Sequence, residues 1–597
     1  MPREWAEPQL VRMIKSMCHE SFYESGTLID ESLGVYVGWA ALKNSFADGM
    51  PVRNESDDVS LVFSGEEYTD PEVVRGLKQR GHSLGEKQSS YLVHICEEDS
   101  NFPACLNGIF HGLLTDRTRG TVTLFNDRYG MHRLYYHESK EALYFAGEAK
   151  AILAVRPELR TPSPQGLGEF AALGCVLENR TIFKDIQVLP AASSWVFRNT
   201  AVERKNTYFD PHEWEQQSSL DPESYYQELR AVLSRILPSY FMGPERVGVA
   251  ITGGLDTRVI MALHSSVPSS VPCYTFGGMF RECQDVQFGR KVAQACQQTH
   301  QVITVGNDFL TQFPHYAERS IYLSEGGVDV YRASDLYVSE KAREIAPAKV
   351  VGTYGSEIVR YAVMFKPIAL ADGLLHPEFM VQVKQAAETY RIIRNAPPVT
   401  FAAFRQSPWY HHGILALEQT QLTVRSPYLD NNFVRSVFRA PSQDISNDDI
   451  RLRLIGNGRS ALGGIRSDRG LGGNSDPLTK AVSRAFLEFS FKAEYAYDYG
   501  MPQPVARIDH FLSAFRLERL FLGRHKFLHF RVWYRDQLSN YVRQMLLDPV
   551  SLSRPYIQKC AMETIVEGHL KGNRNYTTEI HRLLTMELLH RIFFDAS

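Results

Sequence analysis

The apolar residues of this chain follow two different patterns, and the change falls close to residue 210. In the first part, short β-like runs are separated by turns rich in Gly and Asp. Closely spaced strands of this kind are typical of stacked β-sheets with few helices. The predicted strands are 34–39, 59–63, 91–95, 120–125 and 142–146. The first part is therefore predicted to be a β-rich domain.

In the second part, apolar strands alternate with helical segments. A helix over 225–237 precedes a buried apolar run at 247–251, and further runs follow at 271–276 and 301–305. This alternation predicts a parallel, doubly wound sheet, and residues 480–595 have helical spacing. The predicted fold is a two-domain α/β protein. A stacked antiparallel β-sheet domain comes first, followed by a parallel-sheet domain with a helical C-terminus.

Composition sets the domain boundaries and excludes some partners. Residues 1–32 are polar apart from one short amphipathic patch and are predicted to be an N-terminal extension. The Pro- and Gly-richer stretch 156–220 places the boundary near 210–222, so the domains are 33–210 and 222–595. A formal net charge of −3 gives no electrostatic reason to expect nucleic acid or membrane as a partner.

The chain is predicted to be cytoplasmic. No apolar run reaches transmembrane length, and the polar, acidic start does not have the pattern of a signal peptide. The eight cysteines are scattered without paired C-x-x-C spacing, which indicates free thiols in a reducing compartment.

Candidate chemistry concentrates in a glycine-rich loop between a predicted strand and a predicted helix. Gly253 and Gly254 let the backbone approach an anion, and the following helix N-terminus offers free N–H groups. The Asp256 carboxylate suits Mg²⁺, and the Thr252 and Thr257 hydroxyls are donors for phosphate oxygens. An ordinary strand–turn–helix corner is the alternative, but the carboxylate and hydroxyls favour a phosphate site.

Ile251–Thr257 resembles the pyrophosphate-binding loop of the N-type ATP pyrophosphatases, usually Ser-Gly-Gly-x-Asp-Ser, with threonine at both serine positions. The order of later motifs resembles the asparagine synthetase family, whose relatives include β-lactam synthetase and the lasso-peptide cyclases. The resemblance covers about residues 33–590. It implies ATP and Mg²⁺ as cofactors, with ATP held by Ile251, Thr252, Gly253, Gly254, Asp256 and Thr257.

A second strand, near 349–351, runs into a polar turn that resembles the family's second pyrophosphate motif, Ser-Gly-Glu-Gly-Ser-Asp-Glu. Glu357 replaces an aspartate that would ligate Mg²⁺, so the resemblance implies Asp256 and Glu357 as metal ligands. Tyr354 replaces a glutamate linked to amide formation and is the expected catalytic residue of that step. An ordinary surface turn after a strand is the alternative to a second pyrophosphate motif. Further ATP contacts are expected at Gly278, Gly352 and Thr353.

Three further assignments are left open by the sequence. The family's transition-state lysine falls near Arg469, with Lys480 and Lys526 as rivals. The segment 424–430 resembles the element that lines the acyl-substrate pocket of the family. The pair His411–His412 is predicted to lie in an aromatic surface loop, with a pocket-lining role as the alternative.

The first part of the chain resembles the class II glutamine amidotransferase domain, which has an Ntn-hydrolase-like fold. The runs that carry this resemblance are 64–68, 126–136 and 145–150. The family's N-terminal nucleophilic cysteine, however, aligns with Leu33, which has no nucleophilic atom. Cys18 is internal and fifteen residues too early. The domain is therefore predicted to lack glutaminase activity, and to serve as a packing partner or bind something else.

The resemblance implies an ATP-dependent ligase that adenylates a small-molecule or peptide carboxylate and transfers it to ammonia or an amine. Two alternatives remain: an asparagine synthetase that uses ammonium, and a non-catalytic nucleotide-binding or scaffold protein that kept the fold. Family members are often homodimers, so the resemblance also implies a homodimer.

Overall fold

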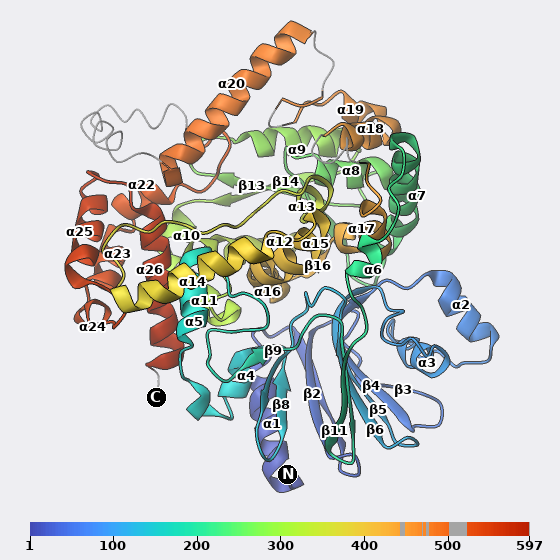
Figure 1. Ribbon diagram of the computed structural model, residues 1–597. Helices are drawn as coiled ribbons and strands as arrows, with labels where there is room; N and C mark the ends of the chain where they lie inside the picture. Colours follow the sequence, from blue (N-terminus) through green and yellow to red (C-terminus); the bar gives the residue numbers. More distant parts are fainter. Residues whose placement is uncertain (442–447, 468–469, 473–476, 501–521, 596–597) are drawn as a thin grey trace.

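The structure is a computed structural model that describes residues 1–597 except 442–447, 468–469, 473–476, 501–521 and 596–597. Figure 1 shows antiparallel sheets of the first part of the chain lying beneath a parallel sheet with its helices. Both predicted domains are thus present, and the parallel sheet is the more heavily covered by helices.

The N-terminal domain contains a six-stranded antiparallel sheet of order β11-β10-β6-β5-β4-β3 and a β1–β2 hairpin. Buried side chains of the hairpin, such as Leu28 and Val37, share one apolar cluster with Leu61 and Phe110 of the larger sheet. The two sheets are therefore stacked, as predicted. A three-stranded sheet of order β8-β7-β9 lies beside them. The strands are β1 (Tyr23–Asp30), β2 (Val35–Leu42), β3 (Val52–Arg53), β4 (Val59–Glu67), β5 (Gly108–Asp116), β6 (Thr121–Asn126), β7 (Tyr135–Glu138), β8 (Leu143–Ala146), β9 (Gln187–Val188), β10 (Ser193–Arg198) and β11 (Ala201–Thr207).

Residues 1–32 are part of this domain, so their prediction as an extension is wrong. They form helix α1 (Arg3–Met17) and strand β1, which pairs antiparallel along the full length of β2. The apolar face of α1 is buried through Leu10, Met13 and Ile14. The patch that looked isolated in the sequence is one stripe of an amphipathic helix, and its partner surface lies on β2.

The predicted strand at 91–95 is also wrong, because this run is helix α3 (Leu92–Glu98). A short apolar run cannot be assigned to strand or helix by periodicity alone. Here Leu92, Val93 and Ile95 are buried against the six-stranded sheet, while Glu97 and Glu98 face outward. The helical spacing also brings His94 and Glu97 onto the same face. The remaining helices of the N-terminal part are α2 (Pro71–Gln79), α4 (Ala149–Leu153), α5 (Pro164–Leu173) and α6 (His212–Glu215).

The second domain is built on a five-stranded parallel sheet of order β14-β13-β12-β15-β16, which confirms the doubly wound prediction. The chain runs from central β12 outward to β14 on one side and then returns to β15 on the other. The switch point is therefore the gap between β12 and β15, and open α/β sheets bind their ligands at this place. The strands are β12 (Val247–Ala250), β13 (Cys273–Gly278), β14 (His300–Val305), β15 (Ala348–Val350) and β16 (Thr423–Arg425).

Helices cover the sheet and form most of the chain after it (Figure 1). Around the sheet lie α7 (Pro222–Tyr240), α8 (Asp256–Leu263), α9 (Gln284–Ala295), α10 (Asn307–Thr311), α11 (Phe313–Ser324), α12 (Ala333–Ile345), α13 (Gly355–Arg360), α14 (Pro377–Ile393), α15 (Pro398–Phe401), a π-helical stretch (Ala402–His411), α16 (His412–Gln419), α17 (Asn431–Val437), α18 (Asp449–Gly458) and α19 (Ser460–Gly463). The C-terminal helices are α20 (Pro477–Tyr495), α22 (Phe530–Arg535), α23 (Ser539–Leu546), α24 (Pro549–Leu552), α25 (Lys559–Leu570) and α26 (Thr577–Leu589). Within the described ranges, none of these helices combines the length and the apolar composition that a bilayer crossing requires.

Buried polar contacts join the two domains directly. The Arg425 guanidinium at the end of β16 pairs with the Glu66 carboxylate of β4 at 2.6 Å. Asn107 donates to the Asp430 carboxylate at 2.8 Å, and Asp430 also caps helix α17. Since buried charges are retained only when paired, these contacts fix the N-terminal domain against the edge of the parallel sheet.

Candidate active site

The first glycine-rich loop connects β12 to α8 at the carboxyl edge of the central strand. The Gly253 N–H donates to Asp285 Oδ1 at 2.8 Å, and the Gly254 N–H donates to Thr252 Oγ1 at 3.3 Å. Helix α8 begins directly afterwards, at Asp256. Both amides already donate to side-chain oxygens, so a phosphate bound by this turn would take the place of the Asp285 and Thr252 acceptors.

The second loop, after β15, packs against the first across the switch point. A Cβ atom added to Gly352 would lie 2.5 Å from the Thr257 backbone nitrogen, and one added to Gly355 would lie 2.7 Å from Asp256 Cγ. Both positions therefore need glycine because of this close approach. Two loops that the sequence placed a hundred residues apart form one surface.

The Asp256 carboxylate is held between two polar side chains. The Ser356 hydroxyl donates to Asp256 Oδ2 at 2.6 Å, and the Arg451 guanidinium pairs with Oδ1. Arg451, from α18, also donates to Ser356 Oγ at 3.1 Å and pairs with Asp448. Arg451 is buried, so its charge is balanced by these two carboxylates. The sequence motifs did not indicate this arginine.

Glu357 and Tyr354 meet a histidine that the sequence analysis assigned to a surface loop. His411 is buried near the end of the π-helical stretch, with its Nε2 atom 3.2 Å from Glu357 Oε1. Its ring lies edge-on to the Tyr354 ring at a centroid distance of 5.3 Å. The surface-loop prediction is wrong, because this segment is helical and His411 and His412 are both buried.

Tyr354 occupies a strained backbone position and a dry environment. Its φ of 74° is in the left-handed region that glycine favours, which is uncommon for an aromatic residue. Burial raises the pKa of the Tyr354 phenol well above its ordinary value, so the neutral form dominates at neutral pH. The residue can therefore donate a hydrogen bond but is a poor base.

The carboxylates expected to bind Mg²⁺ have different partners in the structure. Hard oxygen ligands are what Mg²⁺ prefers, so Asp256 and Glu357 fit the ion in kind. Both Asp256 oxygens, however, are engaged by Ser356 and Arg451, and a Glu357 oxygen is paired with His411. A metal ion at Asp256 would have to compete with the Arg451 guanidinium.

The other expected ATP contacts differ in exposure. Thr252 and Thr353 are exposed, whereas Ile251 is buried and its carbonyl accepts the Thr275 hydroxyl at 2.6 Å. At Gly278, an added Cβ would lie 2.7 Å from the carbonyl oxygen of Phe527. Gly278 therefore contacts the chain of residues 523–527 closely.

Of the three residues predicted as candidates for the cation that stabilises the transition state, only one has a described side chain. Arg469 and the side chain of Lys480 lie outside them. Lys526 is described, and its Nζ atom is 2.8 Å from Asp498 Oδ2 and 4.0 Å from the centre of the Tyr499 ring. It is thus committed to a buried ion pair, while Arg451 and Arg258 are described cations that contact the first loop, Arg258 by donating to the Gly253 carbonyl at 3.1 Å.

A cavity of about 680 Å³ lies beneath α1, lined by residues of the N-terminal domain and by residues of the second domain such as Glu325, His412 and Thr423. Leu33, Ser64, His111 and His132 are among its lining residues, and no cysteine is found among the lining residues that the structure describes. Ser64 Oγ is 2.9 Å from His132 Nε2. Burial raises the pKa of the Cys18 thiol, which disfavours the thiolate.

The buried His111 imidazole, which lines this cavity, makes the stability of the protein depend on pH. Its ring stacks on His132 at 4.5 Å, and burial lowers the pKa of His111 to about 4. An unfolded histidine has a pKa of about 6.5, so the unfolded chain binds more protons between pH 6.5 and 4. The contribution of His111 to the free energy of unfolding is fully present above about pH 6.5 and is lost as the pH falls toward 4.

We therefore expect His111→Asn to lose less stability on acidification than the unchanged protein. The difference between pH 7 and pH 5 should be about 2 kcal/mol, measured from urea unfolding monitored by the N-terminal domain's fluorescence. The same substitution at exposed His212 is the control and should leave the pH dependence unchanged. If His111→Asn and the unchanged protein lose the same stability between pH 7 and pH 5, the His111 side chain is solvated and its pKa is not lowered.

The sequence is similar to one known domain family and to several curated proteins. A family model described as a glutamine amidotransferase domain matches residues 2–209. Asparagine synthetase [glutamine-hydrolyzing] 1 of Bacillus subtilis is 20% identical over 295 residues, which cover 48% of this chain and 46% of the relative. Asparagine synthetase [glutamine-hydrolyzing] 3 of the same organism is 24% identical over 243 residues, covering 39% and 38%.

The chain is thus similar to a glutamine amidotransferase domain over its first third and, at low identity, to part of the asparagine synthetases. Another relative, amidase chyE of Penicillium rubens, is 24% identical over 254 residues and covers 39% of this chain and 36% of its own length. The chain spans less than half the length of each of these three curated relatives.

Solved structures resemble this chain only weakly. A glutamine phosphoribosylpyrophosphate amidotransferase from B. subtilis has a TM-score of 0.27 at 9% identity, covering 50% of this chain and 88% of its own. NMN synthetase from Francisella tularensis has a TM-score of 0.17 at 15% identity, covering 30% and 76%. These scores are too low to support a functional argument, which rests on the geometry of the two loops.

Proposed function

We propose that this protein is an ATP-dependent ligase that activates a carboxylate as its adenylate, releases pyrophosphate, and passes the acyl group to ammonia or an amine. The observation that carries the proposal is the meeting of two glycine-rich loops at the β12–β15 switch point, with Asp256 between them. The names of the relatives, asparagine synthetases and amidases, support carbon–nitrogen chemistry of this class.

In this proposal the first loop and the N-terminus of α8 bind the phosphates of ATP. The Thr252 and Thr257 hydroxyls and the positive end of α8 favour negative charge. The Gly253 and Gly254 amides would donate to the phosphates in place of their present acceptors. Arg451 would add a fixed cation beside the loop, where charge develops as pyrophosphate leaves. Bound Mg²⁺ would supply Lewis-acid polarisation of the phosphates, with Asp256 and Glu357 as its protein ligands.

The amide-forming step would use Tyr354 with its neighbours Glu357 and His411. Because the Tyr354 phenol stays protonated, we assign it to positioning the nitrogen nucleophile by a hydrogen bond. This role fits the sequence-based expectation that Tyr354 acts in the amide-forming step.

Replacing Tyr354 by phenylalanine is therefore expected to slow amide release about 10–100-fold while leaving acid-dependent pyrophosphate release within about twofold. Rapid quenching that follows pyrophosphate and amide separately would measure this split. Tyr361→Phe, another tyrosine at a positive φ close to the same helix, is the control. A normal amide rate in Tyr354→Phe would remove Tyr354 from the mechanism.

The nitrogen is proposed to come from free ammonia or a substrate amine. Leu33 takes the place of the nucleophile in the N-terminal domain, and glutamine hydrolysis by the usual route needs that atom. The test compares ammonium, amines and glutamine as nitrogen sources and assays glutamate release directly. Glutamate formed from glutamine at a rate that matches amide formation would refute this part of the proposal.

A further inference from the structure

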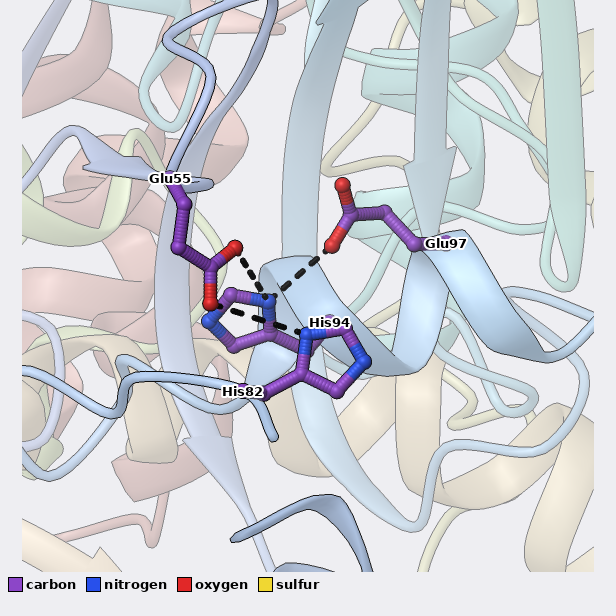
Figure 2. A group of neighbouring side chains, drawn as sticks. All are labelled: Glu55, His82, His94 and Glu97. Carbon is purple, nitrogen blue, oxygen red and sulfur yellow. Dashed lines mark hydrogen bonds and ion pairs between the residues drawn. The ribbon is translucent and has the colours of Figure 1, made fainter. Parts of the chain in front are cut away.

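A cluster of two histidines and two glutamates lies outside the sites described so far. Glu55 is in the turn between β3 and β4, His82 follows α2, and His94 and Glu97 lie one helical turn apart on α3. One ligand atom from each side chain can be chosen so that all four lie within 4.8 Å of one another. Figure 2 shows the four side chains grouped together, with the Glu55 and Glu97 carboxylates facing ring nitrogens of the two histidines.

The separations within the cluster are near those of a metal coordination shell and mostly somewhat longer. His94 Nδ1 is 3.0 Å from Glu97 Oε2 and 3.7 Å from Glu55 Oε2, and His82 Nδ1 is 3.7 Å from Glu55 Oε1. Tetrahedral zinc with bonds of about 2.0–2.1 Å to nitrogen and oxygen places its ligand atoms about 3.3 Å apart. The four ligand atoms lie within 4.8 Å of one another, so the side chains would close inward to surround one ion.

Outer hydrogen bonds already orient the ligands. His82 Nε2 is 2.8 Å from Glu98 Oε1, and Glu98 is held in turn by Arg80. An imidazole that donates Nε2–H to a carboxylate presents the Nδ1 lone pair to a metal, which is the usual arrangement of a zinc-bound histidine. This orientation points Nδ1 at the centre of the cluster.

The two carboxylates are oriented in the same way. The Asn54 side-chain amide donates to Glu97 Oε1 at 2.6 Å, so the other oxygen of Glu97 faces His94. The Ser83 backbone N–H donates to Glu55 Oε1 at 2.7 Å. Each carboxylate thus keeps an oxygen directed at the histidines.

The two imidazoles lie close together, and one of them is buried. Their ring centres are 4.5 Å apart, and His94 is 1% exposed. A divalent cation bound by two neutral imidazoles and two carboxylates would leave no net charge on the cluster.

We propose that Glu55, His82, His94 and Glu97 bind a divalent transition-metal ion, with Zn²⁺ as the best match. A site with four protein ligands and no open position is typical of structural zinc, so the ion would tie α2 and α3 to the β3–β4 turn. These elements lie at the outer side of the N-terminal domain, away from the parallel sheet (Figure 1). The inference does not depend on the proposed ligase activity.

The test uses the full-length protein, treated with a chelator, dialysed and then titrated with Zn²⁺ or Co²⁺. We expect one ion per chain by elemental analysis, intense visible absorption from tetrahedral Co²⁺, and a melting temperature that rises with added Zn²⁺. His82→Gln and Glu55→Gln should each weaken binding by about 100-fold or more, and removal of the outer carboxylate in Glu98→Gln by about tenfold.

A matched control distinguishes Zn²⁺ binding at this cluster from Zn²⁺ binding to any accessible histidine. His212 and Glu215 form a helical pair of the same spacing, with an N–O distance of 2.5 Å, and His212→Gln should bind Zn²⁺ like the unchanged protein. Glu55 and His82 are accessible, so their variants are expected to fold even where His94→Gln does not. Unaltered affinity and stoichiometry in His82→Gln and Glu55→Gln, or failure of the unchanged protein to retain Zn²⁺ at micromolar free ion, would overturn the proposal.

Discussion

Replacing Asp256 by asparagine is expected to lower acid-dependent pyrophosphate release by at least about 100-fold. The carboxylate sits where the two loops meet, accepts from Ser356 and pairs with Arg451. The proposed mechanism needs its negative charge to hold the metal ion against the phosphates, and an amide supplies no such charge. The rate is measured as pyrophosphate released per enzyme at saturating ATP–Mg²⁺.

Asp448→Asn is the matched control for this substitution. Asp448 is the other carboxylate partner of Arg451, so its replacement also removes an ion pair of that arginine while leaving the loop intact. We expect Asp448→Asn to stay within about tenfold of the unchanged protein, with both variants losing about 1–3 kcal/mol of stability. Equal activity losses in both variants would mean that Asp256 acts by holding Arg451 rather than through its own charge.

Replacing Gly352 by alanine is expected to abolish tight ATP binding without unfolding the protein. The new methyl group would lie 2.5 Å from the Thr257 nitrogen and 2.9 Å from the Asp256 carbonyl carbon, and backbone atoms at the start of a helix cannot move aside freely. The two loops must then separate. We expect a loss of about 1–3 kcal/mol in stability and at least about tenfold in ATP affinity, measured by calorimetry.

Gly456→Ala is the control, because it adds the same methyl group to α18, the helix that carries Arg451. Nothing lies within 4 Å of the new atom, and alanine favours helix over glycine by up to about 1 kcal/mol. Stability should rise slightly and ATP affinity should not change. Normal ATP affinity in Gly352→Ala would show that nucleotide does not bind where the two loops meet.

The sequence predicted the parallel sheet and its two loops because their signals are local. A buried strand, a pair of glycines and a helix start lie within one short stretch at 247–257. The close approach of the loops then follows from topology, since parallel strands place their carboxyl ends at one edge of the sheet. The glycines at 352 and 355 are explained by that approach, which only the structure displays.

The sequence does not show which residues from distant segments contact the site. Arg451 lies 195 residues from Asp256 in a helix with no recognisable motif, and nothing in its neighbours marks it as different from a solvated arginine. His411 was placed in a loop because aromatic and histidine residues interrupt the apolar pattern there. In the structure these residues form a π-helical stretch, a form that ordinary periodicity does not reveal.

The same limit explains the errors in the N-terminal domain. The run 91–95 has the length of a strand, and its helical state is decided by packing one face on the sheet. In a strand, His94 and Glu97 would lie on opposite faces, so the strand prediction did not bring the two side chains together. It therefore also hid the metal cluster, whose other two members come from separate turns.

The most direct test of the proposed function is acid-dependent release of AMP and pyrophosphate from ATP–Mg²⁺. Purified full-length protein would be given a panel of carboxylates, aspartate first, with ammonium, amines or glutamine as the nitrogen source. The account predicts pyrophosphate release that requires one class of acid and Asp256, and that proceeds to amide with ammonium or an amine but not with glutamine. Bound ATP with no pyrophosphate across the whole panel would contradict it and favour a nucleotide-binding protein without ligase activity.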